Sequence, residues 1–296
     1  MPLTRTQTQS KYFQLYTNSK HLAWDPAAID LSRDAAEWAV IRRDFANEEF
    51  AKQLHQLCAF FHAGEESVTC TLAPLLGAVS RLKLSVDIEM FLTSQIYEEA
   101  KHFEFFTRYF HEVLGEETSD LLAELTAAPQ AVLIDDLDAT TDRVRAETDP
   151  IRLRALLVEA VAHYMGVVEA MLARTGYVGA GDALGARNWL PGLQEGFRLI
   201  RRDEGRHVSF GIHFLREMTT AHPELIPVVQ NTFERHLPNV LATVQAFDYP
   251  HPIVDLDKLT QYSLDAYQQF MGAIGLGDVD DSALQEEISE ESAQPL

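Results

Sequence analysis

Two short motifs of the form Glu-x-x-His constrain what this chain can fold into. They are Glu99-Ala100-Lys101-His102 and Glu204-Gly205-Arg206-His207, and they begin 105 residues apart. Residues three apart on an α-helix leave the same face, so each motif can present a carboxylate and an imidazole to one metal ion. A single pair of this kind is common by chance and is usually a solvated surface pair. The surroundings of the two motifs therefore decide their meaning.

Each motif has a further glutamate upstream at nearly the same distance. Glu65 precedes Glu99 by 34 residues, and Glu169 precedes Glu204 by 35 residues. A four-helix bundle builds a carboxylate-bridged two-metal site in this way, with one Glu from each of two helices and one Glu-x-x-His from each of the other two. The sequence therefore predicts an all-α, ferritin-like four-helix bundle with additional helices. The six predicted metal ligands are Glu65, Glu99, His102, Glu169, Glu204 and His207.

Apolar residues recur every three or four positions along several stretches, which is the period of a helix with one buried face. Helices are predicted over about 33–44, 48–81, 86–113 and 151–177, then from the Pro191-Gly192 pair to about 218, and over 224–247 and 255–274. The segment between 115 and 149 is expected to form shorter helices that cross one end of the bundle. Gly64, beside Glu65, costs about 1 kcal/mol of helix stability relative to alanine, which indicates close packing there.

One ferritin-like domain over residues 1–276 is expected, since no linker-like composition divides the chain. Residues 1–20 have no steady period and are predicted to form an irregular arm. Residues 277–296 contain seven Asp or Glu and no Lys, Arg or aromatic residue, which predicts a disordered acidic tail.

Composition excludes several classes of function. The net charge of −21 argues against a nucleic-acid partner. Cys58 and Cys70 lie twelve residues apart on one predicted helix and cannot form a disulfide with each other. The sequence shows no signal-peptide pattern and no apolar run near the roughly 18 residues of a membrane span, so we expect a cytoplasmic protein.

The predicted ligand set favours particular metals. Four carboxylates and two imidazoles suit iron or manganese better than zinc or copper. Two divalent ions would neutralise the four carboxylates, and Glu99 and Glu204 are best placed to bridge them. Asp203 is the expected partner for the outer nitrogen of a metal-bound histidine.

The site residues occur within motifs that resemble the ribonucleotide reductase small-subunit superfamily over most of residues 22–250. The motifs are Trp24-Asp25-Pro26, Glu65, Glu99-x-x-His102, Glu169 and Asp203-Glu204-x-x-His207. Two departures argue against nucleotide reduction. Phe106 occupies the position of the radical tyrosine, and the 29 residues after Tyr267 contain no tyrosine for radical transfer.

Within that superfamily, further fragments look closest to the ligand-binding oxidases. The fragments are Ala63-Gly64-Glu65-Glu66-Ser67-Val68-Thr69, Glu98-Glu99-Ala100-Lys101-His102, Tyr164, Thr175-Gly176-Tyr177 and Asp203-Glu204-Gly205-Arg206-His207-x-x-Phe210-Gly211. The resemblance implies a homodimer that activates O2 at one manganese and one iron, or at two irons. It also implies a long-chain fatty acid, or a similar apolar carboxylate, that bridges the metals.

The same resemblance assigns individual roles. Manganese would take the side of Glu65, Glu99 and His102, and iron the side of Glu169, Glu204 and His207. Val68 and Tyr164 would form an ether cross-link. Tyr177 would lie just outside the metal ligands and support them without binding a metal itself. The choice of Glu65 over Glu66 follows the family motif, because Val68 then falls at the family's distance.

Spacing alone does not predict the role of Tyr164. In an α-helix, Tyr164 would lie about 140° round from Glu169, as an ordinary core tyrosine would. Three functions stay open from the sequence. The first is a dimetal oxidase that carries out two-electron oxidation of a C–H bond. The second is a reductase small subunit without its radical tyrosine, and the third is a non-enzymatic metal- or lipid-binding bundle.

Overall fold

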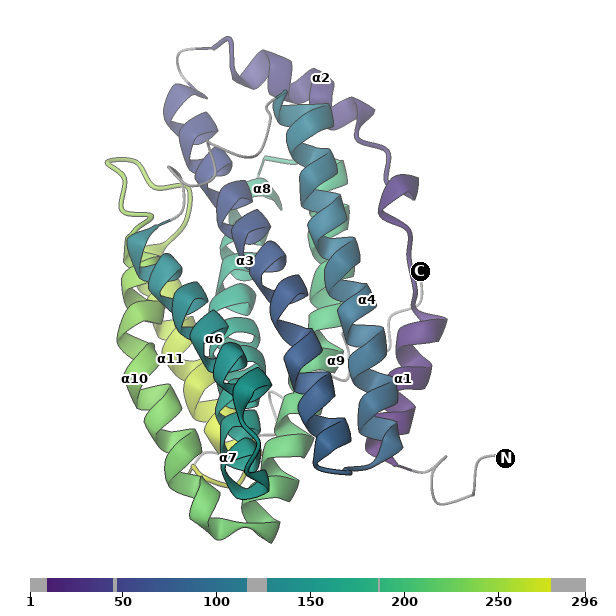
Figure 1. Ribbon diagram of the computed structural model, residues 1–296. Helices are drawn as coiled ribbons and strands as arrows, with labels where there is room; N and C mark the ends of the chain where they lie inside the picture. The colour runs from purple at the N-terminus through teal and green to yellow at the C-terminus, as the bar shows by residue number, and fades with distance from the viewer. Residues whose placement is uncertain (1–9, 45–46, 116–126, 186, 278–296) are drawn as a thin grey trace.

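Four long helical segments lie side by side and carry the six predicted ligands (Figure 1). They belong to a computed structural model that describes residues 10–44, 47–115, 127–185 and 187–277, with no strand among these residues. The first two segments are α3 (Glu48–Arg81) and α4 (Val86–Tyr109). The third is a continuous run of α7 (Pro150–Val161), η5 (Ala162–Ala173) and α8 (Arg174–Gly185). The fourth is α9 (Pro191–Ala221), and this arrangement confirms the predicted all-α, ferritin-like fold.

Local sequence signals fix where these segments begin. The Ser85 side chain accepts a hydrogen bond from the Asp87 amide at 3.2 Å and so caps α4. Asp149 accepts from the amides of Ile151 and Arg152, both at 3.0 Å, and Pro150 follows at the first helical position. Both patterns satisfy amides that a helix cannot bond internally.

The N-terminal arm differs from its prediction. Residues 11–20 are not irregular, because α1 (Lys11–His21) is a helix that packs on α4 and α9. Ser10 caps this helix, and the Tyr12 hydroxyl donates to Glu217 at 2.7 Å. Tyr12 and Leu15 are buried, so tertiary contacts stabilise a helix whose own apolar period is weak.

The segment between the second and third bundle helices also corrects a prediction. Its described part forms one 19-residue helix, α6 (Ala128–Ala146), which packs along α3 and α10 instead of crossing an end of the bundle (Figure 1). Leu133 and Leu137 of α6 are buried against the bundle. The helix therefore extends the core sideways.

The remaining elements cover the outside of the bundle. Near the N-terminus these are η2 (Pro26–Ala28) and α2 (Ser32–Ile41), and η4 (Phe110–Leu114) extends α4. After α9 come η6 (Pro223–Leu225), α10 (Ile226–Gln245) and α11 (Leu256–Ala273). The α10 and α11 helices pack against η5, so they cover the middle of the third bundle segment.

This third segment corrects the expectation that no apolar run is near the length of a membrane span, since Pro150–Gly185 is long and apolar enough to cross a membrane by length and composition alone. In the fold, however, 78% of its most apolar window is buried inside the protein. This is the behaviour of a central core helix. The predicted acidic tail, apart from Gly277, lies outside the described residues.

The middle of this segment is a π-helix. Over Ala162–Ala173 the backbone follows the π pattern, in which hydrogen bonds join residues five apart, and such stretches are frequent at functional sites. Gly211 of α9 faces it closely, since a Cβ at Gly211 would lie 2.5 Å from Met165 Cβ. The absence of a side chain at Gly211 lets α9 approach the π-helix.

Candidate metal centre

The six predicted ligands converge in the centre of the bundle. Glu65 comes from α3, Glu99 and His102 from α4, Glu169 from η5, and Glu204 and His207 from α9. None is more than 5% exposed. Four carboxylates and two imidazoles thus share one buried volume.

The donor atoms form two overlapping groups. One group contains Glu65, Glu99, His102 and Glu204, and the other contains Glu99, Glu169, Glu204 and His207. Within each group, one donor atom per residue lies within 4.8 Å of the others. We call these groups the His102 subsite and the His207 subsite. Glu99 and Glu204 belong to both, in the position of bridging ligands.

Distances within the His102 subsite fit a metal ion better than hydrogen bonds. His102 Nδ1 lies 3.3 Å from Glu99, 3.4 Å from Glu65 and 3.5 Å from Glu204. Ligands about 2.1 Å from an octahedral ion are about 3 Å apart. The Nδ1 atoms of both histidines and one oxygen each of Glu99, Glu169 and Glu204 are buried and have no hydrogen-bond partner. Buried polar atoms rarely stay unpaired, so this set fits a pair of cations.

The electrostatics of the site without metal lead to the same conclusion. Burial raises the pKa of Glu65 to about 8, although His102 beside it has the opposite effect. Burial and the neighbouring Glu204 raise the pKa of Glu169 well above its usual range. Burial alone would lower the pKa values of the two histidines, but Glu65 and Glu99 beside them raise these values well above normal. Protons therefore compensate the charge when cations do not.

Each histidine turns its other nitrogen to a carboxylate outside the subsites. His102 Nε2 lies 3.2 Å from Asp203 Oδ2, and His207 Nε2 lies 2.9 Å from Glu98 Oε2. Such partners orient metal-binding imidazoles and fix their tautomer. Asp203 thus lies where the sequence placed a histidine partner, whereas Glu98 was not singled out for this role.

Sequence reasoning also missed the cations behind the histidines. Arg206 is fully buried and donates to both Glu98 and Asp203, and the Lys101 ammonium lies 3.1 Å from Asp203. Burial alone would raise the pKa of Asp203, but Arg206, His102 and Lys101 hold it well below its usual range. Both cations lie inside the Glu-x-x-His motifs, but the sequence does not indicate that they are buried, because charged residues of a helix usually face solvent.

Tyr164 faces the site because of the π-helix. Its hydroxyl donates to Glu99 Oε1 at 2.5 Å. Residues five apart are hydrogen-bonded neighbours in a π-helix, so Tyr164 and Glu169 can share a face that an α-helix would not give them. Burial and the surrounding carboxylates raise the pKa of Tyr164 well above normal, which keeps it a neutral phenol.

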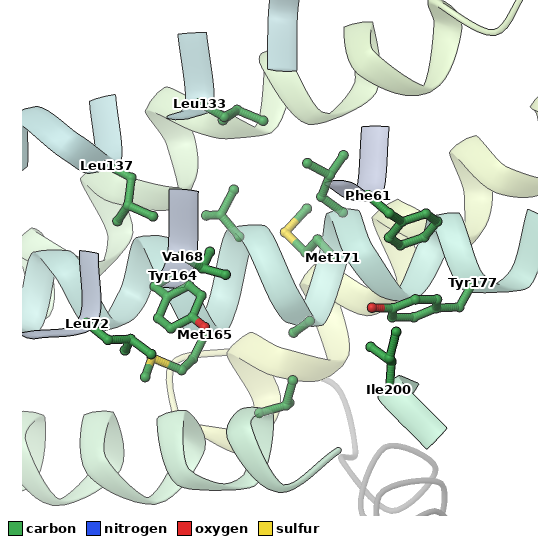
Figure 2. Close-up of a cluster of buried hydrophobic side chains, with 14 of the residues drawn as sticks. Phe61, Val68, Leu72, Leu133, Leu137, Tyr164, Met165, Met171, Tyr177 and Ile200 are labelled. Atoms are coloured by element: carbon green, nitrogen blue, oxygen red, sulfur yellow. The ribbon is translucent and has the colours of Figure 1, made fainter. Parts of the chain in front are cut away.

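Val68 and Tyr164 line the same small cavity, of about 40 Å³, beside Glu65, Glu99, Glu169 and Glu204. Figure 2 draws both in one cluster of buried side chains. Gly64 lines this cavity too, and a Cβ there would meet nothing within 4 Å. The expected close packing at Gly64 is therefore wrong, because the glycine borders open space.

Two further aromatic residues complete the site. Tyr177 is buried and stacks on Phe61 with ring centroids 4.7 Å apart, and its hydroxyl has no hydrogen-bond partner. Because this hydroxyl donates to none of the predicted ligands, the role of Tyr177 beside the metal centre stays a prediction. Phe106 is fully buried and stacks on the other side of the same cluster, 5.5 Å from Phe61.

Fold and site together define a dimetal-carboxylate protein of the ferritin-like class. The chain belongs to the ribonucleotide reductase small-chain family, whose model matches residues 6–276, and this places it among the oxidoreductases.

Similar solved structures are R2-like ligand-binding oxidases with one substituted residue. One with an anaerobically reconstituted Mn/Fe cofactor has a TM-score of 0.80 and 24% identity, and the match covers 91% of this chain and 95% of that one. Another prepared in the same way has a TM-score of 0.79 and 25% identity over the same shares. A third, aerobically reconstituted, has a TM-score of 0.73 and 25% identity over 96% and 92%.

Metal affinity should rise steeply with pH. A metal ion must displace the proton that Glu65 holds below its pKa of about 8. Because Glu169 and the two histidines also hold protons in the metal-free site, we expect the Kd for Mn²⁺, measured anaerobically by calorimetry, to fall at least tenfold per pH unit between pH 6 and pH 8.

Glu66 provides the matched control, since it is an exposed carboxylate next to Glu65. Glu65→Gln should weaken binding and flatten the pH dependence, and Glu66→Gln should change neither. A Kd that does not vary with pH, or equal effects of the two substitutions, would contradict the assignment.

Proposed function

We propose that the protein is an O2-activating dimetal oxidase that holds one manganese and one iron. The observation that carries the proposal is the pair of overlapping subsites with unpaired nitrogens and oxygens at their centre. Glu65, Glu99 and His102 would hold manganese, and Glu169, Glu204 and His207 would hold iron. The Mn/Fe cofactor of similar oxidases at 25% identity supports this choice of metals.

The proposed chemistry joins Val68 to Tyr164. Reduction of O2 to two waters needs four electrons, and a bound manganese and iron, each able to give up one electron, would supply two of them. The other two come from the protein, when the Val68 Cβ–H and Tyr164 O–H bonds break and a C–O ether bond forms. The two released hydrogens and two protons from solvent complete the waters. Glu99, which accepts the phenolic hydrogen bond, holds the Tyr164 oxygen beside the predicted metal ligands.

The burial of the site supports a controlled oxidation. Val68 is 5% exposed and Tyr164 is 1% exposed, so bulk water does not compete for the oxidant. Phe106 and Phe61, close to the site, have no hydroxyl from which a stable phenoxyl radical could form. The neighbouring hydroxyl that donates directly to a predicted ligand is that of Tyr164.

Mass spectrometry tests the cross-link. After aerobic loading with Mn²⁺ and Fe²⁺, we expect the peptides that contain Val68 and Tyr164 to be joined, with the mass of two hydrogen atoms missing. Anaerobic loading and the Tyr164→Phe variant should give separate peptides, and Tyr177→Phe should still give the joined product. Separate unmodified peptides after aerobic loading would contradict the proposal.

We further propose a long-chain fatty acid, or a similar apolar carboxylate, as the bound ligand. The 40 Å³ cavity beside the carboxylates has room for a head group, and not for a long chain. A second, apolar cavity of about 30 Å³ lies between α3, α8, α10 and α11. Phe60 and Leu172 line both cavities, so movement of these two side chains would join them into one channel.

A bulky residue between the two cavities should exclude the acyl chain of a bound fatty acid. We expect Leu172→Trp to lower the fatty acid extracted per protein chain at least tenfold, while Ile151→Trp, at a site 72% exposed on the preceding helix, leaves it unchanged. Extraction into organic solvent followed by mass spectrometry measures both. Equal lipid content in Leu172→Trp and wild type would contradict the channel.

The reductase small subunit is the second candidate, and family membership favours it. Its expected product is a nucleotide, and it needs a large-subunit partner. The buried Phe106 leaves no hydroxyl at the position of the radical tyrosine, which favours the oxidase. The homodimer and the cytoplasmic location stay predictions from the sequence.

A further inference from the structure

The two subsites differ in the charge behind their histidines. His207 Nε2 faces Glu98 at 2.9 Å, and His102 Nε2 faces Asp203 at a longer 3.2 Å. Both carboxylates are buried, at 2% and 0% exposure, so their charges are poorly screened by water. The groups around each carboxylate therefore decide how strongly it pulls on the imidazole N–H.

One cation is shared equally. Arg206 Nη2 donates to Glu98 Oε1 and to Asp203 Oδ1, and the arginine side chain is fully buried. This guanidinium ties together the carboxylates that orient the two histidines. It cannot by itself make the two subsites different.

The second cation acts on one side only. Lys101 is 3% exposed, and its ammonium lies 3.1 Å from Asp203 Oδ2, the oxygen that faces His102. The same oxygen also accepts a hydrogen bond from Trp24 Nε1 at 2.8 Å. The corresponding oxygen of Glu98, besides facing His207, accepts a hydrogen bond from the neutral Ser19 hydroxyl at 3.3 Å. Among the ion pairs shorter than 4 Å described here, Asp203 thus has Arg206 and Lys101 as partners, and Glu98 has Arg206.

We propose that Lys101 makes the two subsites unequal, by weakening divalent metal binding in the His102 subsite relative to the His207 subsite. A carboxylate that is neutralised by Lys101 polarises the His102 N–H less, so the imidazole donates less electron density to a metal. The ammonium also repels a dication directly. Two subsites with the same donor types thereby become different enough to take two different metals.

Arg202 is a third buried cation near these carboxylates, and its charge interacts with both Asp203 and Glu98. Like Arg206, it acts on both sides. Lys101 is the cation whose ammonium pairs with Asp203 and not with Glu98, and the fold places it behind His102.

Site-resolved metal occupancy tests this proposal. Crystals of the full chain would be loaded without oxygen with one equivalent of Mn²⁺, and anomalous scattering at the manganese edge would give the occupancy of each subsite. We expect Lys101→Met to raise the ratio of His102-subsite to His207-subsite occupancy about tenfold. Lys101→Arg keeps the charge and should leave the ratio within about twofold of wild type.

Two further variants guard against a purely structural effect. Lys101→Gln keeps a hydrogen-bond donor for Asp203 but no charge, and it should behave like Lys101→Met. Glu98→Gln removes the negative charge behind His207, and it should raise the same ratio by weakening the other subsite. An unchanged or lower ratio in Lys101→Met and Lys101→Gln, or the same ratio in Lys101→Arg as in Lys101→Met, would overturn the proposal.

The proposal rests on the two-metal part of the proposed function and not on its oxygen chemistry. Failure of the Val68–Tyr164 cross-link would leave the occupancy ratios as expected. A protein that takes up no Mn²⁺ in either subsite would overturn this proposal together with the metal centre.

Discussion

The burial of four carboxylates at one point is the constraint on which the rest of the structure depends. Glu65, Glu99, Glu169 and Glu204 are at most 5% exposed, and isolated buried carboxylates are among the most unfavourable groups a fold can contain. Two cations at the centre, or protons in their place, are needed to compensate them. The helices are therefore arranged around an electrostatic requirement, and the apolar core encloses it.

A second group of buried charged residues lies just outside the ligands and contributes to the same charge compensation. Glu98 and Asp203 hold the outer nitrogens of the histidines, and Arg206 joins these two carboxylates. The α1 helix covers this layer, since Ser19 contacts both Glu98 and Arg206. A peripheral helix thus shields an ionic network from water, and interactions between charges are stronger where water is absent.

The bundle and its six ligands could be predicted from the sequence, because the ligands occur in motifs with short, regular spacings. The two Glu-x-x-His motifs and their upstream glutamates predict both the bundle and the convergence of six side chains. The position of Tyr164 followed from the family resemblance and not from spacing, because the α-helical period assigns it to another face and the π-helix over Ala162–Ala173 changes that period. Residues 11–20 were expected to be irregular because their helix depends on distant partners such as Glu217. Lys101 and Arg206 were overlooked because charged residues inside a helical motif usually face solvent.

The central claim is that six side chains hold two metal ions at one point. Diffraction from crystals of the metal-loaded protein, recorded at the manganese and iron absorption edges, tests it most directly. The account predicts two anomalous peaks about 3.5–4 Å apart, one beside His102 Nδ1 and one beside His207 Nδ1, with Glu99 and Glu204 between them. No peak in the bundle, or a single ion bound elsewhere on the described chain, would contradict it.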